Sequence, residues 1–107
     1  MGTNLHRVWD TQIIDWYSTG EATWLRERNS LATPQIAAAW SKGTVEDWAT
    51  ESLLEARLVY CLPGTDNLIR SGARLGEGYC RFALPIIQQR LAQSAVRIAS
   101  TLNRIFK

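Results

Sequence analysis

The sequence is poor in the residues from which most metal sites and catalytic dyads are built. It contains one histidine, His6, and two cysteines, Cys61 and Cys80, which lack the paired spacing of a zinc knuckle. A serine nucleophile activated by histidine has little support, because there is no second histidine and no acid partner can be placed. No apolar run approaches the roughly 18 residues that indicate a membrane span. The first ten residues also lack the apolar stretch of a signal peptide.

The composition that remains is that of a folded domain. A length of 107 residues with 46% hydrophobic content allows one domain with a modest core and is too short for two. The charged fraction is 21% and there are five tryptophans, which argues against disorder because disordered segments lack such apolar surface. We therefore expect a single domain over residues 1–107, with most of the tryptophans in its core.

The charges are distributed unevenly along the chain. All ten acidic residues precede Gly78, whereas Arg81, Arg90, Arg97, Arg104 and Lys107 follow it. Three of these arginines recur every seven residues and so line one side of a helix. Such a row can meet nucleic-acid phosphates or an anionic membrane surface. The more ordinary interpretation is a solvated face whose cations suit the helix dipole.

The apolar spacing predicts helices throughout. The first is capped by Thr3 or Asn4 and runs to about Ser18, and the second covers about 21–28 with Trp24 and Leu25 facing inward. Thr33-Pro34 starts a third, and Thr44 with Asp47 resembles a capping box for a fourth that reaches Tyr60. A short helical piece follows at 79–82, and a long helix begins at Pro85.

The middle of the chain is rich in turn residues. Its stretch "LPGTDNLIRSGARLGEG" contains four glycines, but it has neither the spacing nor the Lys-Ser/Thr ending of a phosphate-binding loop. Cys61 and Cys80 flank this stretch, and the sequence leaves open whether they form a disulfide or two buried thiols. We predict an all-α, irregular multi-helix domain of about five or six helices with a long C-terminal helix.

One pair of residues stands at the spacing of metal ligands. His6 and Asp10 are four residues apart on the first helix, so their side chains lie on one face. Imidazole nitrogen and carboxylate oxygen are both good zinc ligands, yet zinc usually takes four ligands or three and a water. An exposed surface pair explains the same spacing, so the spacing alone does not decide between the two interpretations.

Three stretches resemble a known family. "TNLHRVWDTQIID" looks like the histidine- and aspartate-bearing helix of the zinc-dependent S-one/P-one nucleases, which are related to bacterial zinc phospholipase C. "DWATES" resembles the family's Trp-Ala-x-Glu-Ser segment. "LGEGYCRFALPIIQQRLAQSAVRIASTLNRIF" resembles its closing stretch, where Leu-Gly and Tyr lead to a proline and a long helix. The resemblance covers nearly the whole chain in order.

The resemblance implies an all-helical fold holding three zinc ions that hydrolyse RNA, single-stranded DNA or 3′-nucleotides. It assigns His6 and Asp10 as ligands of one zinc, and it assigns no catalytic or other cofactor-binding residue in this chain. It also implies nucleic acid or nucleotides as partners, and a secreted or periplasmic location.

This chain departs from the family by lacking most of the metal ligands. In the family a free N-terminal Trp, further histidines and bridging aspartates lie upstream of the motif, whereas here the motif begins at Thr3. The chain therefore resembles the C-terminal portion of a family member, and we expect it to be inactive unless the missing upstream portion is supplied. A fragment of a longer protein, a decayed descendant and a helical scaffold kept for another use all fit this pattern. A homo-oligomer that brings two copies of His6 and Asp10 together is a further hypothesis. The alternative function is a helical interaction or oligomerisation module without catalysis.

Overall fold

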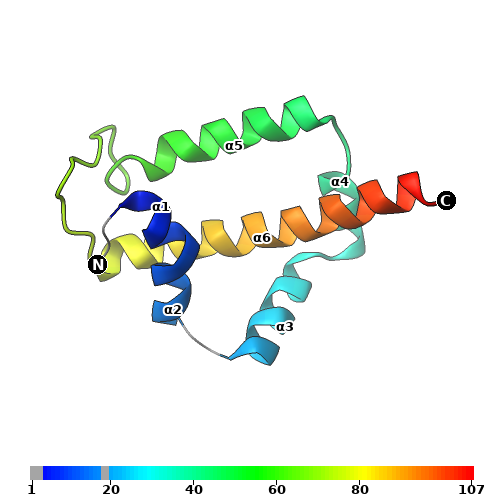
Figure 1. The fold of residues 1–107 in the computed structure, drawn as a ribbon, viewed down its shortest axis with the longest axis horizontal. Helices are drawn as coiled ribbons and strands as arrows, with labels where there is room; N and C mark the ends of the chain where they lie inside the picture. Colours follow the sequence, from blue (N-terminus) through cyan, green and yellow to red (C-terminus); the bar gives the residue numbers. More distant parts are fainter. Residues whose placement is uncertain (1–3, 18–19) are drawn as a thin grey trace. The chain divides into compact units, whose positions relative to one another are not determined.

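The computed structural model describes residues 4–17 and 20–107, and its regular structure is helical (Figure 1). Within these residues there are six α-helical segments and one π-helical segment, and no β-strand. Their order is α1 (Leu5–Arg7), η1 (Val8–Gln12), α2 (Ile13–Tyr17), α3 (Glu21–Leu31), α4 (Pro34–Trp40), α5 (Val45–Val59) and α6 (Glu77–Ile105). The predicted all-α class with a long C-terminal helix is confirmed.

The helix starts were predicted by their capping residues. The Oδ1 atom of Asn4 accepts a hydrogen bond from the backbone N–H of Arg7 at 2.8 Å, so Asn4 caps the first helix; the other candidate, Thr3, lies outside the described residues. Thr44 and Asp47 form a reciprocal capping box, with distances of 3.2 and 2.8 Å between side-chain oxygen and backbone nitrogen. The expected end of the first helix near Ser18 also falls outside the described residues.

The prediction of two separate helices around Pro85 was wrong. Residues 77–105 form one helix with Pro85 inside it. A proline there cannot donate to the carbonyl of Arg81, which costs a helix about 3 kcal/mol in isolation. The helix continues because packed side chains lie on both sides of the proline, and Cys80, Ala83 and Ile87 are all buried.

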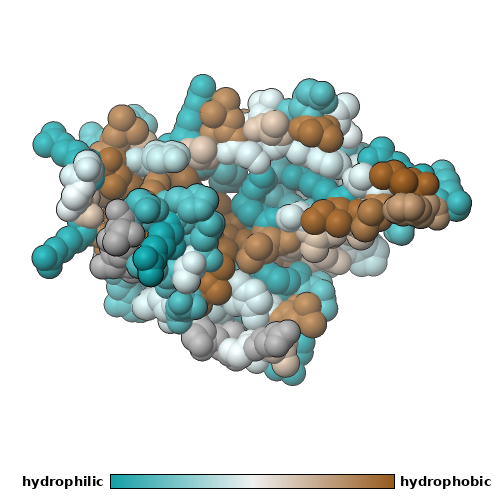
Figure 2. All heavy atoms as spheres, in the orientation of Figure 1, coloured by the Kyte–Doolittle hydropathy of each residue, from teal (hydrophilic) through white to brown (hydrophobic). Residues whose placement is uncertain are grey.

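The apolar side chains of α6 are only partly covered. Ile87 is buried, whereas Ile98, Leu102 and Ile105 are each about half exposed or more. Figure 2 shows hydrophobic side chains gathered at the C-terminal end of α6. No helix in the described part of the chain is both long and apolar enough to cross a membrane.

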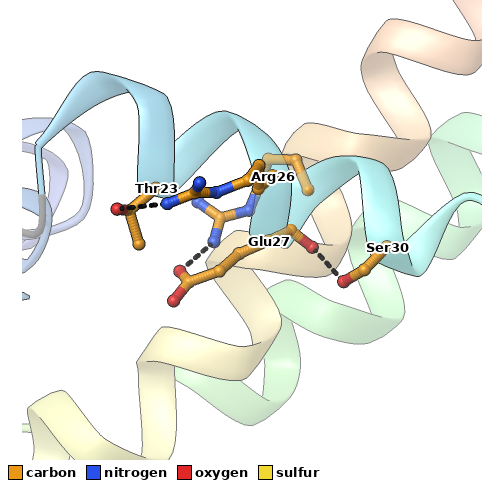
Figure 3. Close-up of polar contacts among 5 residues, drawn as sticks. Thr23, Arg26, Glu27 and Ser30 are labelled. Carbon is orange, nitrogen blue, oxygen red and sulfur yellow. Dashed lines mark hydrogen bonds and ion pairs between the residues drawn. The ribbon is translucent and has the colours of Figure 1, made fainter.

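Helix α3 is three residues longer than predicted, and it turns a different side inward. Leu25, expected on the inner face, is 58% exposed, and Arg28 is buried in its place. The Arg28 guanidinium lies 3.7 Å from the centre of the Trp24 ring, so its long side chain covers the apolar surface that leucine was expected to cover. Figure 3 shows the polar contacts of this helix, including the Ser30 hydroxyl that donates to the Glu27 carbonyl at 2.8 Å.

The chain divides into two compact units. One joins Met1–Ser18 to Thr44–Pro85, and the other joins Thr19–Gly43 to Ile86–Lys107. The buried apolar side chains of the first unit come from several of its elements: Val8, Ile13, Leu75, Tyr79, Cys80 and Ala83. In the second unit Ile87 and Ala92 are buried on α6. The expectation of a single domain over residues 1–107 stays a prediction.

Candidate functional site

His6 and Asp10 lie side by side at the start of the first unit. The Nε2 atom of His6 is 2.8 Å from the Oδ2 atom of Asp10, across one turn between α1 and η1. Their side chains are 85% and 61% exposed. The two donor atoms can therefore bind one common metal ion from the solvent side of the helix.

The outward direction of this pair follows from the residues on the other side of the same helix. Val8 and Ile13 are almost completely buried, with exposed fractions of 2% and 0%. They lie five residues apart around a π-helical turn, in which the N–H of Ile13 donates to the carbonyl of Val8. Because these two apolar side chains fix the inner face, His6 and Asp10 are held on the outer one.

The π-helical turn is a feature that the sequence did not predict. It spans Val8–Gln12 and so includes Asp10, and it shifts the residues after it relative to an uninterrupted α-helix. π-Helical turns inside α-helices are rare and occur often at functional sites. Here the turn gives the aspartate and its neighbour Trp9 positions that differ from those of a regular helix.

A hydrogen-bonded chain anchors this turn to two other helices of the unit. The Trp9 indole Nε1–H donates to the Tyr79 hydroxyl at 2.8 Å, and that hydroxyl donates to the Val59 carbonyl at 2.7 Å. The rings of Trp9 and Tyr79 meet edge to face, with centroids 6.4 Å apart. Burial raises the pKa of Tyr79, so its hydroxyl keeps the proton that it donates. The sequence analysis predicted Tyr79 in a short helix but did not predict its hydrogen bonds with Trp9 and Val59.

The donor set fits part of a zinc site. An imidazole nitrogen and a carboxylate oxygen are ligands that zinc accepts, and both are accessible here. They are two ligands, where zinc usually takes four or three and a water. Across residues 4–17 and 20–107, no three or more His, Cys, Asp or Glu side chains gather into a group that could hold a metal ion.

The two cysteines are thiols in the structure rather than halves of a disulfide. Cys61 is partly exposed and Cys80 is buried. Burial raises the pKa of the Cys80 thiol, which keeps it protonated and unreactive at neutral pH. Of the two possibilities left open by the sequence, the structure has the thiols.

Two of the three arginines in the row on α6 make hydrogen bonds to the protein. The Arg97 Nε–H donates to the Trp40 carbonyl at 3.0 Å, and Arg90 donates from Nη1 to the Gln93 side chain at 3.0 Å. Arg90 and Arg97 therefore differ from the fully solvated side chains of the ordinary interpretation, whereas Arg104 is exposed.

The tryptophans also differ from expectation, because none of the five is fully buried and Trp16 is 42% exposed. Large side chains with a polar group are often only partly covered.

The comparisons with known proteins agree with the motif around His6. Over residues 1–107 the chain matches the family model described as S1/P1 Nuclease. It is 31% identical to Endonuclease 3 of Arabidopsis thaliana over 118 residues, covering 97% of this chain and 38% of that protein. It is 32% identical to Endonuclease 5 of the same organism over 126 residues, with the same two coverages. The chain thus spans little more than a third of the length of these relatives, and no solved structure matches it. It belongs to the S1/P1 nuclease family.

Proposed function

We propose that this chain supplies part of the metal site of a nuclease, with His6 and Asp10 as two ligands of one zinc ion. The observation that carries the proposal is the exposed pair of donor atoms 2.8 Å apart in a member of the S1/P1 nuclease family. The relatives are named endonucleases, and the substrates proposed here are RNA, single-stranded DNA and 3′-nucleotides. The proposed location, secreted or periplasmic, rests on the family alone.

Zinc bound at such a site supplies Lewis acidity, which activates water and stabilises charge on a phosphate. The residues of this chain have the role of holding the ion and fixing its position. His6 has to offer a neutral imidazole nitrogen and Asp10 an ionised carboxylate, so metal affinity falls when the solution becomes acidic. The buried Val8 and Ile13, with the Trp9–Tyr79 hydrogen bond, keep the helix that carries both ligands in place.

Two ligands do not complete a zinc site, so the remaining ligands of a working centre have to come from elsewhere. Candidates are an upstream portion of the polypeptide or a second copy of this chain, in which two His6–Asp10 pairs would give four ligands. We therefore expect the 107-residue chain alone to hydrolyse little or no nucleic acid.

Zinc content tests the ligand assignment directly. The purified chain is incubated with zinc, dialysed and examined by elemental analysis, beside His6→Ala and Asp10→Asn. Glu77→Gln is the matched control, because Glu77 forms another exposed pair at the same spacing, with Arg81 at 2.6 Å. We expect about one zinc per chain or per pair of chains, kept in the control and lost in the two ligand variants. No zinc in the wild type, or equal zinc in all four proteins, contradicts the assignment.

Nuclease activity tests the second part of the proposal. The chain with zinc should release little acid-soluble nucleotide from RNA or single-stranded DNA. Release that disappears in His6→Ala would contradict the expected inactivity of the chain and would support the ligand role of His6.

The alternative function is a helical interaction module without catalysis. The observation that favours it is the exposed apolar surface of α5, where Leu53, Leu54 and Leu58 are each more than half exposed. Contiguous surface of this kind favours association with another protein or another copy. Zinc that the wild type retains and His6→Ala loses would separate the metal-site proposal from this one.

A further inference from the structure

The first unit contains a cavity of about 570 Å³ on another face of the helix that carries the metal pair. Leu5 and Val8 line it, and these two residues are three apart, so they share one face. His6 and Asp10 are four apart and share a different, solvent-facing side. The cavity is therefore distinct from the pair of candidate metal ligands, neither of which lines it.

The opposite wall of the cavity carries two arginines and no acid. Arg70 and Arg74 both line it, and none of its lining residues is Asp or Glu. Within the part of the chain that the structure describes, neither guanidinium makes an ion pair or a hydrogen bond with the protein. The acid that follows them, Glu77, is already paired with Arg81. Both arginines are exposed, so their positive charges are accessible to a ligand.

Arg70 begins a tight turn, and Arg74 directly follows that turn. The N–H of Ala73 donates to the carbonyl of Arg70 at 3.0 Å, which closes a four-residue turn over residues 70–73. Gly72 has a φ of 81° while Ser71 has a negative φ, and this combination is that of a type II turn. Gly72 is needed there because other residues rarely adopt that φ.

Two further contacts hold the turn in place. The N–H of Ile69 donates to the carbonyl of Tyr60 at 2.8 Å, which joins the start of the turn to the end of α5. Leu75 is buried on its other side. These contacts hold the backbone of the turn in place, so less of the chain has to be ordered when a ligand binds.

The cavity also has an aromatic side chain. Tyr60 lines it, and its ring is 56% exposed. Arginine pairs with phosphate through two parallel hydrogen bonds, and aromatic rings stack on nucleic-acid bases. A volume of about 570 Å³ is within the range of small-molecule sites. We infer that this cavity binds a nucleotide unit, with its phosphate held by Arg70 and Arg74 and its base against Tyr60. The choice of a nucleotide among phosphate esters rests on the proposed nuclease function, whereas the phosphate site does not.

Calorimetric titration with adenosine 5′-monophosphate tests this inference. The solution contains EDTA, so that no zinc bound by His6 and Asp10 contributes. Arg70→Gln and Arg74→Gln should each weaken binding about tenfold, which is the loss of one charge-assisted contact. Arg57→Gln is the matched control, because Arg57 is an exposed arginine of the same unit outside the cavity, and it should change the affinity by less than about twofold. An equal loss in the control would show a general charge effect and would overturn the site.

Two further ligands separate the phosphate from the base. Adenosine without its phosphate should bind at least about tenfold more weakly than the monophosphate, and equal binding would overturn the role of the arginines. Inorganic phosphate should bind more weakly than the nucleotide, and only the nucleotide should lose affinity in Tyr60→Leu. If inorganic phosphate binds as tightly as the nucleotide, the nucleotide assignment is wrong. His6→Ala should leave all of these affinities unchanged, so the cavity and the metal ligands can fail independently.

Discussion

At the scale of single residues, Tyr79 links the helix of the candidate metal ligands to the rest of its unit. Its hydroxyl accepts from Trp9 at 2.8 Å and donates to the carbonyl of Val59 at 2.7 Å, so one oxygen atom connects three helical segments. The side chain is 4% exposed, and that burial raises its pKa. A buried hydroxyl with two partners leaves both of them unsatisfied when it is removed.

Tyr79→Phe should therefore lower the free energy of unfolding by about 1–2 kcal/mol, because the ring is kept while the Trp9 N–H and the Val59 carbonyl lose their partner. Urea unfolding followed by circular dichroism measures this difference. The matched control is Tyr60→Phe, whose hydroxyl belongs to a half-exposed side chain with no hydrogen bond to another described residue. Equal stability of the two variants would show that the Tyr79 hydroxyl is not needed to hold this helix.

At the scale of secondary-structure elements, α5 offers a comparison between two threonines. The Thr44 side chain accepts from the backbone N–H of Asp47 at 3.2 Å and caps the helix, whereas the Thr50 hydroxyl donates to the carbonyl of Glu46 at 3.0 Å inside it. Thr44→Ala should cost about 1 kcal/mol because a backbone donor at the helix start loses its partner. Thr50→Ala should be neutral or slightly stabilising because alanine has the higher helix propensity. Thermal unfolding measures both, and an equal loss in the two variants would contradict the cap.

The elements that could be predicted from the sequence are those with local signals. Asn4, Thr33 and Thr44 each satisfy a backbone donor close by, so the three helix starts were correct. The continuity of α6 through Pro85 has no local signal, because a proline usually ends a helix. The burial of Arg28 has none either, because an arginine is usually exposed. The four-residue spacing of His6 and Asp10 in the sequence indicated their contact. The π-helical turn could not be predicted, because no residue pattern in the sequence marks it. Arg70 and Arg74 belong to a turn-rich stretch without helical or strand periodicity, so the sequence did not predict where their side chains lie.

At the scale of the whole molecule, the question is which surfaces the chain offers to other molecules. It spans 38% of the length of Endonucleases 3 and 5, and its two candidate zinc ligands lie on the solvent side of their helix. Apolar side chains on α5 and at the end of α6 are exposed as well. Surfaces of both kinds are those that a protein uses when another polypeptide completes its site or covers its helices.

Self-association is the prediction that belongs to this scale. Leu54 and Leu58 lie one turn apart on α5 and are 56% and 58% exposed, so we expect the mass in sedimentation equilibrium to rise above 12.1 kDa with concentration. Leu58→Glu should reduce this association because a charge in an apolar contact has to lose its water. Val45→Glu is the control, because Val45 is also exposed but lies on another face of α5. A chain that stays monomeric at high concentration, or two variants that associate alike, would argue against contacts through this face of α5.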